Sequence, residues 1–233
     1  MTRPVDRRAI VTGGASGMGA ATVAALRVRG VAVAVFDVAD DPPVDVADPD
    51  SVAAGVARVR AELGQIDIVV NAAGIGTGGT LDDPEYPATW ERTLAVNLTG
   101  AMHVVRACLD DLVASGAGRI VNVASTEGLV AARRTSPYTV SKHGLVGFTR
   151  SLAVDLGRQG VTANAVCPGP IVTGMTAAIP EAARDEYARR NVPAGRYGRP
   201  EEVAHLIVAL TDVEASYVNG AVITVDGGMT AMG

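Results

Sequence analysis

The stretch that decides the fold reads AIVTGGASGMG, residues 9–19. Three apolar residues come first, glycines follow, and an alanine-rich segment continues to about residue 29. This order predicts a short strand, a tight turn and a helix, which is the context that gives a glycine turn functional meaning. Such a turn lets backbone N–H groups approach a pyrophosphate at a helix N-terminus, where the helix dipole favours an anion. Alone it is weak evidence, because ordinary turns are also rich in glycine.

A second strand strengthens the case for a dinucleotide. Residues 31–36 form an apolar run that ends at Asp37, 18 residues after Gly19. At a spacing of about 20 residues, an acidic side chain accepts hydrogen bonds from the adenosine ribose of a dinucleotide. A carboxylate there also repels a 2′-phosphate, and no Arg or Lys at positions 15, 16, 38 or 39 offsets its charge. The pattern predicts NAD(H) rather than NADP(H); a capping or turn aspartate is the alternative.

The rest of the chain alternates strands and helices, which is typical of a doubly wound α/β sheet. Further strands are expected at residues 44–46, 66–70, 120–124, 161–166 and 218–225. Helices are expected at residues 49–63, across 83–111 as a hairpin or one long helix, from 138 onward and at 201–210. Only seven residues separate Asp37 from Asp45, too few for a crossover helix of at least about 10 residues. We therefore expect a single Rossmann-type domain over residues 1–233, with that helix missing or reduced to a loop and a substrate flap around 171–199.

The only lysine of the protein, Lys142, lies four residues after Tyr138. On a helix this spacing places both side chains on one face. An ammonium close to a phenol lowers the pKa of the phenol below its usual value of about 10, which makes Tyr138 a candidate proton acceptor. A compact ammonium also suits a site that must touch several oxygens better than a guanidinium does. The alternative is an ordinary surface pair on a helix.

Other polar residues are candidates for the same site. The strand at 66–70 ends in NAAG, residues 71–74, whose small side chains would let a cofactor lie against the backbone or would simply form a turn. Asn97 lies among apolar residues and needs a partner, either as a functional residue or as a satisfied core asparagine. Ser125 follows the strand at 120–124, at the edge where open α/β sheets bind ligands.

Composition limits the class of function. The 233 residues carry a net charge of −5, which gives no basic surface for nucleic acid. No segment approaches transmembrane length, and residues 1–8 lack the apolar stretch of a signal peptide. The two cysteines, Cys108 and Cys167, have no metal-ligand spacing and are expected to be free buried thiols. These features predict a cytoplasmic protein without metal, membrane or nucleic-acid partner, and the preference for arginine over lysine favours a bacterial source of high GC content.

Taken together, the motifs resemble the short-chain dehydrogenase/reductase family. The resemblance rests on TGxxxGxG at residues 12–19, NAAG at 71–74, Asn97, Ser125, Tyr138-x-x-x-Lys142 and PG at 168–169, in the family's order across essentially the whole chain. It implies that Tyr138 is the acid/base and that Ser125 binds the substrate oxygen. It implies that Lys142 lowers the tyrosine pKa and holds the nicotinamide ribose, while Asn97 anchors a water that links Lys142 to solvent. The cofactor contacts that it implies are Gly13, Ser16, Gly17, Met18, Gly19, Asp37, Asp45, Val46, Asn71, Ala72, Gly74, Tyr138, Lys142, Pro168, Gly169, Ile171 and Thr173.

The resemblance also implies an architecture and an assembly. The implied sheet has seven parallel strands in the order 3-2-1-4-5-6-7, and the implied assembly is commonly a homotetramer, with a dimer as the other homo-oligomer to consider. In the tetramer the helix after Tyr138 pairs with its symmetry mate, which would explain the apolar stripe of Leu145, Phe148 and Leu152. The absence of a helix after Asp37 is a difference from the family pattern, and it affects the part of the site where the adenine of the cofactor would bind.

The expected activity is hydride transfer between NAD(H) and a secondary alcohol or ketone of a small metabolite. A 3-ketoacyl-carrier-protein reductase is the alternative within the family. A non-catalytic NAD-binding sensor is the alternative from another class, and the intact Ser125, Tyr138 and Lys142 argue against it. Arg133 and Arg134 could present a guanidinium to an acidic substrate or form a solvated pair on a loop. The sequence leaves the substrate and the preferred direction open.

Overall fold

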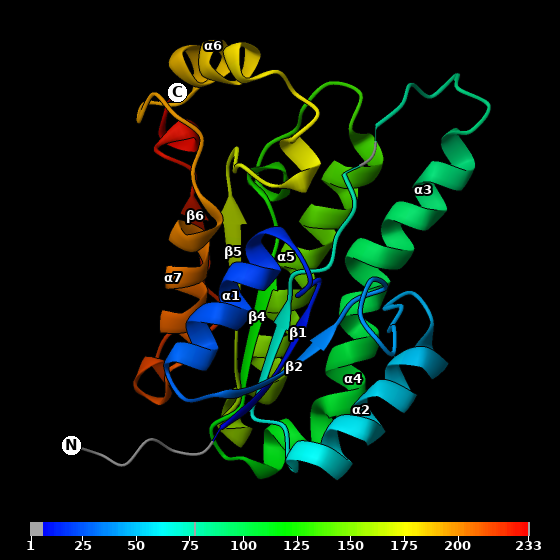
Figure 1. Cartoon of the computed structure of the whole chain (residues 1–233), viewed down its shortest axis with the longest axis vertical. Helices are drawn as coiled ribbons and strands as arrows, with labels where there is room; N and C mark the ends of the chain where they lie inside the picture. Colours follow the sequence, from blue (N-terminus) through cyan, green and yellow to red (C-terminus); the bar gives the residue numbers. More distant parts are fainter. Residues whose placement is uncertain (1–6, 77, 233) are drawn as a thin grey trace.

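The computed structural model describes residues 7–76 and 78–232, so residues 1–6, 77 and 233 of the predicted 1–233 unit lie outside the described residues. Within that part of the chain, six parallel strands form one sheet in the order β2-β1-β3-β4-β5-β6 (Figure 1). The strands are β1 (Arg8–Thr12), β2 (Ala32–Phe36), β3 (Ile68–Asn71), β4 (Arg119–Val123), β5 (Thr162–Pro168) and β6 (Val222–Val225). The parallel Rossmann-like α/β fold is confirmed. The predicted order 3-2-1-4-5-6-7 agrees with the observed order when the predicted third strand, at residues 44–46, is left out.

The prediction of a strand at residues 44–46 is wrong, because these residues form a loop. The backbone N–H of Val44 donates to the carbonyl oxygen of Asp37 at 3.0 Å, within the loop, and not to a neighbouring strand. Val44 and Val46 are nevertheless buried in the core, so their apolar pattern reflects packing and not strand pairing. The loss of the crossover helix is confirmed, because residues 37–48 contain no helix. Strand β2 therefore forms the edge of the sheet on this side.

Two layers of helices enclose the sheet (Figure 1). One face packs against α1 (Gly17–Val28) and α7 (Pro200–Thr211), and the other packs against α2 (Pro49–Leu63), α4 (Gly100–Ala114) and α5 (Ser136–Leu156). The region predicted as a hairpin or one long helix is continuous, because α3 (Tyr86–Leu94) passes through one π-helical segment, η1 (Ala95–Thr99), into α4. Short aliphatic side chains from both layers fill the two cores, as the alanine- and valine-rich composition allows.

The segment predicted as a substrate flap lies at the carboxyl ends of the strands. It contains the short turn η4 (Gly174–Thr176) and α6 (Glu181–Asn191), which stands at one end of the molecule in Figure 1. The two ends of the segment are joined, because Ile171 and Gly198 form an isolated parallel bridge. The N–H of Val172 donates to the carbonyl of Gly198 at 2.9 Å. These contacts fix the base of the segment 171–199 on the end of β5.

Helix α5 turns much of its apolar stripe inward. Leu145 is 1% exposed and Leu156 is buried, whereas Phe148 and Leu152 are half-buried against the core. The expectation that the whole stripe pairs with a second subunit is therefore wrong for Leu145, which the core of its own chain covers. The homo-oligomeric state stays a prediction.

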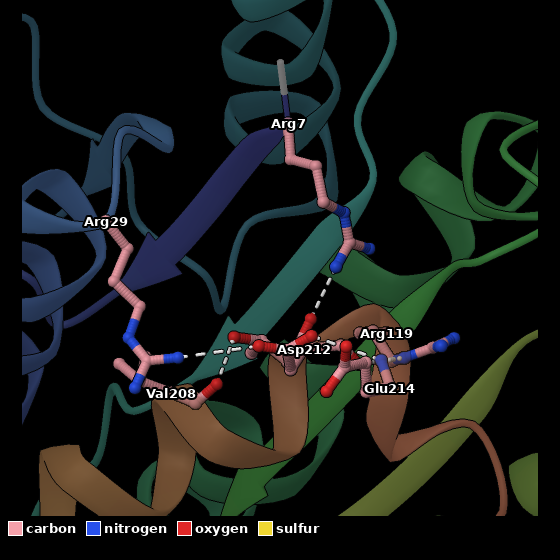
Figure 2. Close-up of polar contacts among 7 residues, drawn as sticks. Arg7, Arg29, Arg119, Val208, Asp212 and Glu214 are labelled. Atoms are coloured by element: carbon pink, nitrogen blue, oxygen red, sulfur yellow. Dashed lines mark hydrogen bonds and ion pairs between the residues drawn. The ribbon is translucent and has the colours of Figure 1, made fainter. Parts of the chain in front are cut away.

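Buried arginines cover the amino ends of the strands, at the end of the sheet opposite the glycine turn. Arg119, the first residue of β4, is 1% exposed and donates to the carbonyl oxygen of Asp212 at 3.0 Å, while Arg7 donates to the carbonyl of Thr211. Figure 2 shows Arg7, Arg29 and Arg119 around Asp212 at the end of α7. Guanidinium donors satisfy the last carbonyl groups of a helix, and their charge complements the negative end of its dipole. The arginines thus tie α7 to the sheet far from the glycine turn.

Candidate active site

The glycine turn between β1 and α1 packs directly on the segment after β3. Gly13 has φ +66°, and a Cβ there would lie 2.8 Å from the backbone of Ala73. A Cβ on Gly19 would lie 2.1 Å from the carbonyl oxygen of Gly13. The hydroxyl of Thr12 accepts hydrogen bonds from the N–H groups of Ala72 and Ala73, each at 3.0 Å. The turn therefore needs glycine at these positions, and Thr12 locks the two loops together.

Helix α1 begins without a side-chain cap. Ser16 occupies the N-cap in extended backbone, its side chain makes no capping hydrogen bond, and the first turn holds no acidic residue. One oxygen of the Asp37 carboxylate accepts from the N–H of Ala15 at 3.1 Å, so this side chain lies against the glycine turn. A Cβ on Gly17, where φ is +52°, would lie 3.4 Å from the Thr173 side chain. The turn thus meets both Asp37 and the segment after β5.

The donors and acceptors around this turn fit a dinucleotide. The N-terminus of α1 offers backbone N–H groups and a positive dipole end to phosphates. Asn71, at the end of β3, is 4% exposed and donates from Nδ2 to Asn122 at 2.8 Å, but its Oδ1 has no partner among the described residues. A buried acceptor without a partner costs about 1–3 kcal/mol, so it is a ready acceptor for a ligand donor. Asp37 retains lone pairs for ribose hydroxyls.

Ser125, Tyr138 and Lys142 lie together at the carboxyl end of β4. Ser125 lies just beyond the end of β4, and its side chain is close enough to the phenol of Tyr138, in the first turn of α5, to lower the pKa of that phenol. Lys142 lies one turn further along α5, is 4% exposed, and donates from Nζ to the carbonyl oxygen of Val123 at 2.9 Å. Its Nζ lies 5.6 Å from the centroid of the Tyr138 ring. The i, i+4 pair is therefore not a surface pair, since Tyr138 lines the cleft and Lys142 is buried beside it.

The charge states of this group differ from the sequence-based prediction. Burial raises the pKa of Tyr138, and the neighbouring Ser125 side chain, which lowers this pKa, does not compensate. Burial also lowers the pKa of Lys142 to about 8. The predicted lowering of the tyrosine pKa is wrong for the protein alone, because the cost of placing a phenolate in a desolvated site exceeds the stabilisation. At neutral pH Tyr138 carries its proton.

Asn97 lies in the π-helical segment η1, a kind of helical irregularity common at functional sites. Its Oδ1 accepts from the N–H of Ile75 at 2.8 Å, and its Nδ2 donates to the carbonyl of Ile75 at 3.0 Å and to Ser141 at 3.1 Å. A Cβ on Gly74 would lie 3.4 Å from Asn97 Oδ1 and 3.5 Å from Lys142 Nζ. The amide is fully bonded, as a core asparagine would be, and it also holds the backbone beside Lys142.

A cleft of about 670 Å³ opens above Ser125 and Tyr138. Several predicted site residues line it, namely Met18, Ser125, Tyr138, Pro168, Gly169, Ile171 and Thr173. The other residues that line the cleft are Gly76, Gly78, Ala124, Thr126, Glu127, Val130, Ala131, Ala132, Thr135, Pro170, Met175, Thr176, Ile179, Ala183, Tyr187, Tyr197 and Met229. Arg133 and Arg134 are exposed and do not contribute to this lining, which favours the solvated-pair interpretation.

Asp45 and Val46 stand apart from the residues that the structure brings together. Val46 packs in the core, where its side chain would lie 2.7 Å from a Cβ on Gly100. The exposed Asp45 carboxylate accepts from the N–H of Ala47 at 2.9 Å. In the described residues no hydrogen bond joins either of them to the glycine turn. Their role at the adenine side rests on the family resemblance alone.

Sequence reasoning missed several residues of the site. Thr12 and Ser141 are anchors, and only their positions within known motifs could have drawn attention to them. Glu127 was not among the predicted site residues, although an acidic residue two positions after Ser125 is a signal in the sequence that could have indicated it. Tyr197 and Met229 line the cleft although they are far in sequence from the other site residues, and no sequence pattern predicts that they do so.

Two negative findings apply to the part of the chain that the structure describes. No three His, Cys, Asp or Glu side chains converge as a metal ion would require. None of the described helices is both long and apolar enough to span a bilayer.

A parallel sheet with a glycine turn and a Ser-Tyr-Lys cluster at its carboxyl edge is typical of the dinucleotide-dependent oxidoreductases. A family model described as enoyl-(acyl carrier protein) reductase matches residues 13–230. The chain belongs to the short-chain dehydrogenase/reductase family and is an oxidoreductase of that family.

Relatives of known activity share nearly the full length of the chain. The chain is 40% identical to cis-4-hydroxycyclohexanecarboxylate dehydrogenase of Sinomonas cyclohexanicum, over 97% of this chain and 98% of the relative. It is 36% identical to 3-oxoacyl-[acyl-carrier-protein] reductase of Thermotoga maritima, over 94% of this chain and 96% of the relative. Among solved structures, ligand-free aldohexose dehydrogenase of Thermoplasma acidophilum superposes with a TM-score of 0.92 at 29% identity, covering 99% of this chain and 96% of that chain.

Proposed function

We propose that the protein catalyses the NAD(H)-dependent interconversion of a secondary alcohol and a ketone on a small, hydroxylated ring compound. The observation that carries this proposal is that Ser125 and Tyr138 line the cleft together while Lys142 is buried beside the Tyr138 ring. The ring is suggested by the relatives, which are named for a hydroxycyclohexanecarboxylate and for aldohexoses. A cleft of about 670 Å³ suits a substrate of that size.

The proposed roles follow from the positions of these three side chains. In ketone reduction the protonated Tyr138 donates its proton to the substrate oxygen, which suits its raised pKa. Ser125 donates a hydrogen bond to the same oxygen while negative charge develops on it. Lys142 is buried beside the tyrosine, and its ammonium compensates the phenolate that remains. When bound, the nicotinamide supplies or accepts the hydride and, in its oxidised form, adds a positive charge that favours the phenolate needed for alcohol oxidation.

The preference for NAD(H) over NADP(H) rests on Asp37. Its carboxylate lies against the N–H of Ala15 in the glycine turn, where a ribose phosphate would meet a second negative charge. We expect the Asp37→Asn variant to lose much of its preference for NAD⁺, measured as the ratio of kcat/KM with NAD⁺ to kcat/KM with NADP⁺. An unchanged ratio would refute this role of Asp37.

The proton-transfer role is tested by the Tyr138→Phe variant. We expect turnover to fall at least about 100-fold, the scale of lost acid/base catalysis, while NADH binding measured by fluorescence stays within about threefold. Tyr217→Phe is the matched control, because Tyr217 is 100% exposed and lies outside the cleft. Alcohols and ketones of cyclohexanes, sugars, diols and hydroxysteroids form the substrate panel. Unchanged turnover of Tyr138→Phe would refute the role of Tyr138 in proton transfer. If the wild type turns over no compound of the panel, the alternative of a non-catalytic NAD-binding sensor is favoured.

A 3-oxoacyl-carrier-protein reductase remains the second candidate, because the Thermotoga maritima relative bears that activity in its name. A comparison of acyl-carrier substrates with small ring ketones, each assayed with NADH and NADPH, separates the two candidates.

A further inference from the structure

The substrate cleft carries one unbalanced negative charge. Among the described residues that line it, Glu127 is the only one with a charged side chain. The rest of the lining is apolar or carries hydroxyl groups, and the nearby Arg133 and Arg134 point to solvent instead of contributing to it. Among the described residues no cationic side chain lines the cleft beside this carboxylate, because the ammonium of Lys142 is buried next to the Tyr138 ring and does not reach the lining.

Neutral hydrogen bonds fix the position of this carboxylate. Its Oε2 accepts from the hydroxyls of Thr135 at 2.6 Å and Thr139 at 2.7 Å. The backbone N–H of Glu127 donates to the hydroxyl of Ser125 at 3.1 Å, so the residue is anchored to the serine that would bind the reacting oxygen. Hydroxyl donors hold one oxygen of the carboxylate without cancelling its charge, and Oε1 retains its capacity to accept a hydrogen bond.

The field of Glu127 reaches the centre of the site. The pKa of Tyr138 is raised chiefly by burial, and the negative charge of Glu127 adds to that rise. A substrate that occupies the cleft above Tyr138 lies in the same field. In a partly desolvated cleft a second anion is repelled far more strongly than in bulk water.

We propose that Glu127 determines specificity by selecting neutral substrates that carry a second hydrogen-bond donor, such as a diol or a hydroxyamide, and by rejecting carboxylates. The donor would bind Oε1 while the reacting hydroxyl meets Ser125 and Tyr138. This inference rests on the proposed alcohol–ketone function, which it narrows to one charge class of substrate.

The test uses two ring compounds of the same shape and different charge, 4-hydroxycyclohexanecarboxamide and 4-hydroxycyclohexanecarboxylate. Calorimetry with the protein saturated in NADH gives the ratio of the two Kd values without any turnover, and kcat/KM with NAD⁺ gives a second ratio. We expect the wild type to favour the amide at least about tenfold in both, equivalent to about 1.4 kcal/mol. The Glu127→Gln variant should reduce the preference to about threefold or less, because glutamine keeps an oxygen that accepts from Thr135 and Thr139 but lacks the charge.

Glu181→Gln is the matched control, since Glu181 is an exposed acid at the start of α6 that does not line the cleft. It removes the same charge and should leave both ratios unchanged, and thermal melting shows whether each variant is folded. Equal affinity of the wild type for the two compounds, a ratio that Glu127→Gln does not change, or an equal effect of Glu181→Gln would overturn the proposal. So would the failure of both compounds to bind. A Kd ratio of the expected size without turnover would contradict the proposed function and leave the charge selection standing.

Discussion

Replacement of Lys142 by methionine should change the pH dependence of stability in a defined direction. The pKa of Lys142 is lowered by burial from 10.5 to about 8. Between these two values the unfolded chain binds a proton that the folded protein does not. The wild type therefore becomes more stable as the pH rises from about 8 towards 10.5, and the full destabilisation is present below about 8.

The magnitude follows from the two pKa values. One pKa unit corresponds to about 1.4 kcal/mol, so the difference between 10.5 and about 8 amounts to about 3 kcal/mol of lost stability at neutral pH. Integration of the titration gives a change of about 2 kcal/mol between about pH 7 and about pH 9.5. The variant also loses the hydrogen bond from Lys142 Nζ to Val123, but that loss shifts its stability by a similar amount at every pH in this range.

The assay is urea unfolding of the wild type and Lys142→Met at several pH values between about 7 and 9.5. The quantity to compare is the difference between the two free energies of unfolding at each pH, because titrating groups that do not interact with Lys142 occur in both proteins and cancel. We expect the wild type to gain about 2 kcal/mol relative to the variant as the pH rises. Hydride-transfer activity of the variant should fall sharply at every pH.

A difference that stays constant with pH would show that Lys142 has a similar proton affinity in the folded and unfolded states. A difference of the opposite sign would show that the folded protein stabilises the ammonium. Either result would refute the reasoning from burial. It would also revive the sequence-based expectation that a fully charged lysine lowers the pKa of Tyr138.

Further predictions concern the sheet edge, the glycine turn and helix α5. Arg119→Met should lower the free energy of unfolding by about 3–5 kcal/mol, because it leaves buried carbonyl groups without a hydrogen-bond donor. Arg29→Ala removes a half-exposed ion pair and should lower the free energy of unfolding by less than about 1 kcal/mol in the same urea titration. Gly19→Ala should weaken NADH binding at least about tenfold in a fluorescence titration, because its Cβ would meet the carbonyl of Gly13 at 2.1 Å; unchanged binding would contradict the tight turn. Gly147→Ala places a methyl group on the exposed side of α5, where nothing lies within 4 Å, and should raise stability by about 0.5–1 kcal/mol.

The sequence predicted the fold well because its elements follow one another at regular spacing. It predicted a strand at residues 44–46 incorrectly because a buried loop and a buried strand show the same apolar pattern, and only hydrogen-bond partners distinguish them. The contact of Ser125, Tyr138 and Lys142 could be anticipated because strand ends and helix faces determine where such residues lie. The direction of the tyrosine pKa could not, since it depends on the balance between burial and hydrogen bonding in three dimensions.

The cleft marks the limit of sequence reasoning. Tyr197 and Met229 join its wall only because the segment after β5 and the end of the chain fold back over the carboxyl edge of the sheet. No periodicity connects such residues. Glu127 could have been predicted as a site residue, since it lies close to Ser125 in the sequence. The absence of a cationic side chain from the described lining of the cleft is a property of the fold and could not be predicted.

The burial of Lys142 has a practical consequence for chemical labelling. As the sole lysine of the chain and only 4% exposed, it leaves no lysine side chain on the surface for acylating dyes, aldehyde fixatives or amine-reactive cross-linkers. Lysine-based coupling to a solid support should therefore be inefficient at the surface, and any modification of Lys142 should coincide with loss of activity. Introduction of one lysine at an exposed position, such as Arg106→Lys on α4, would create a uniquely addressable handle for oriented immobilisation.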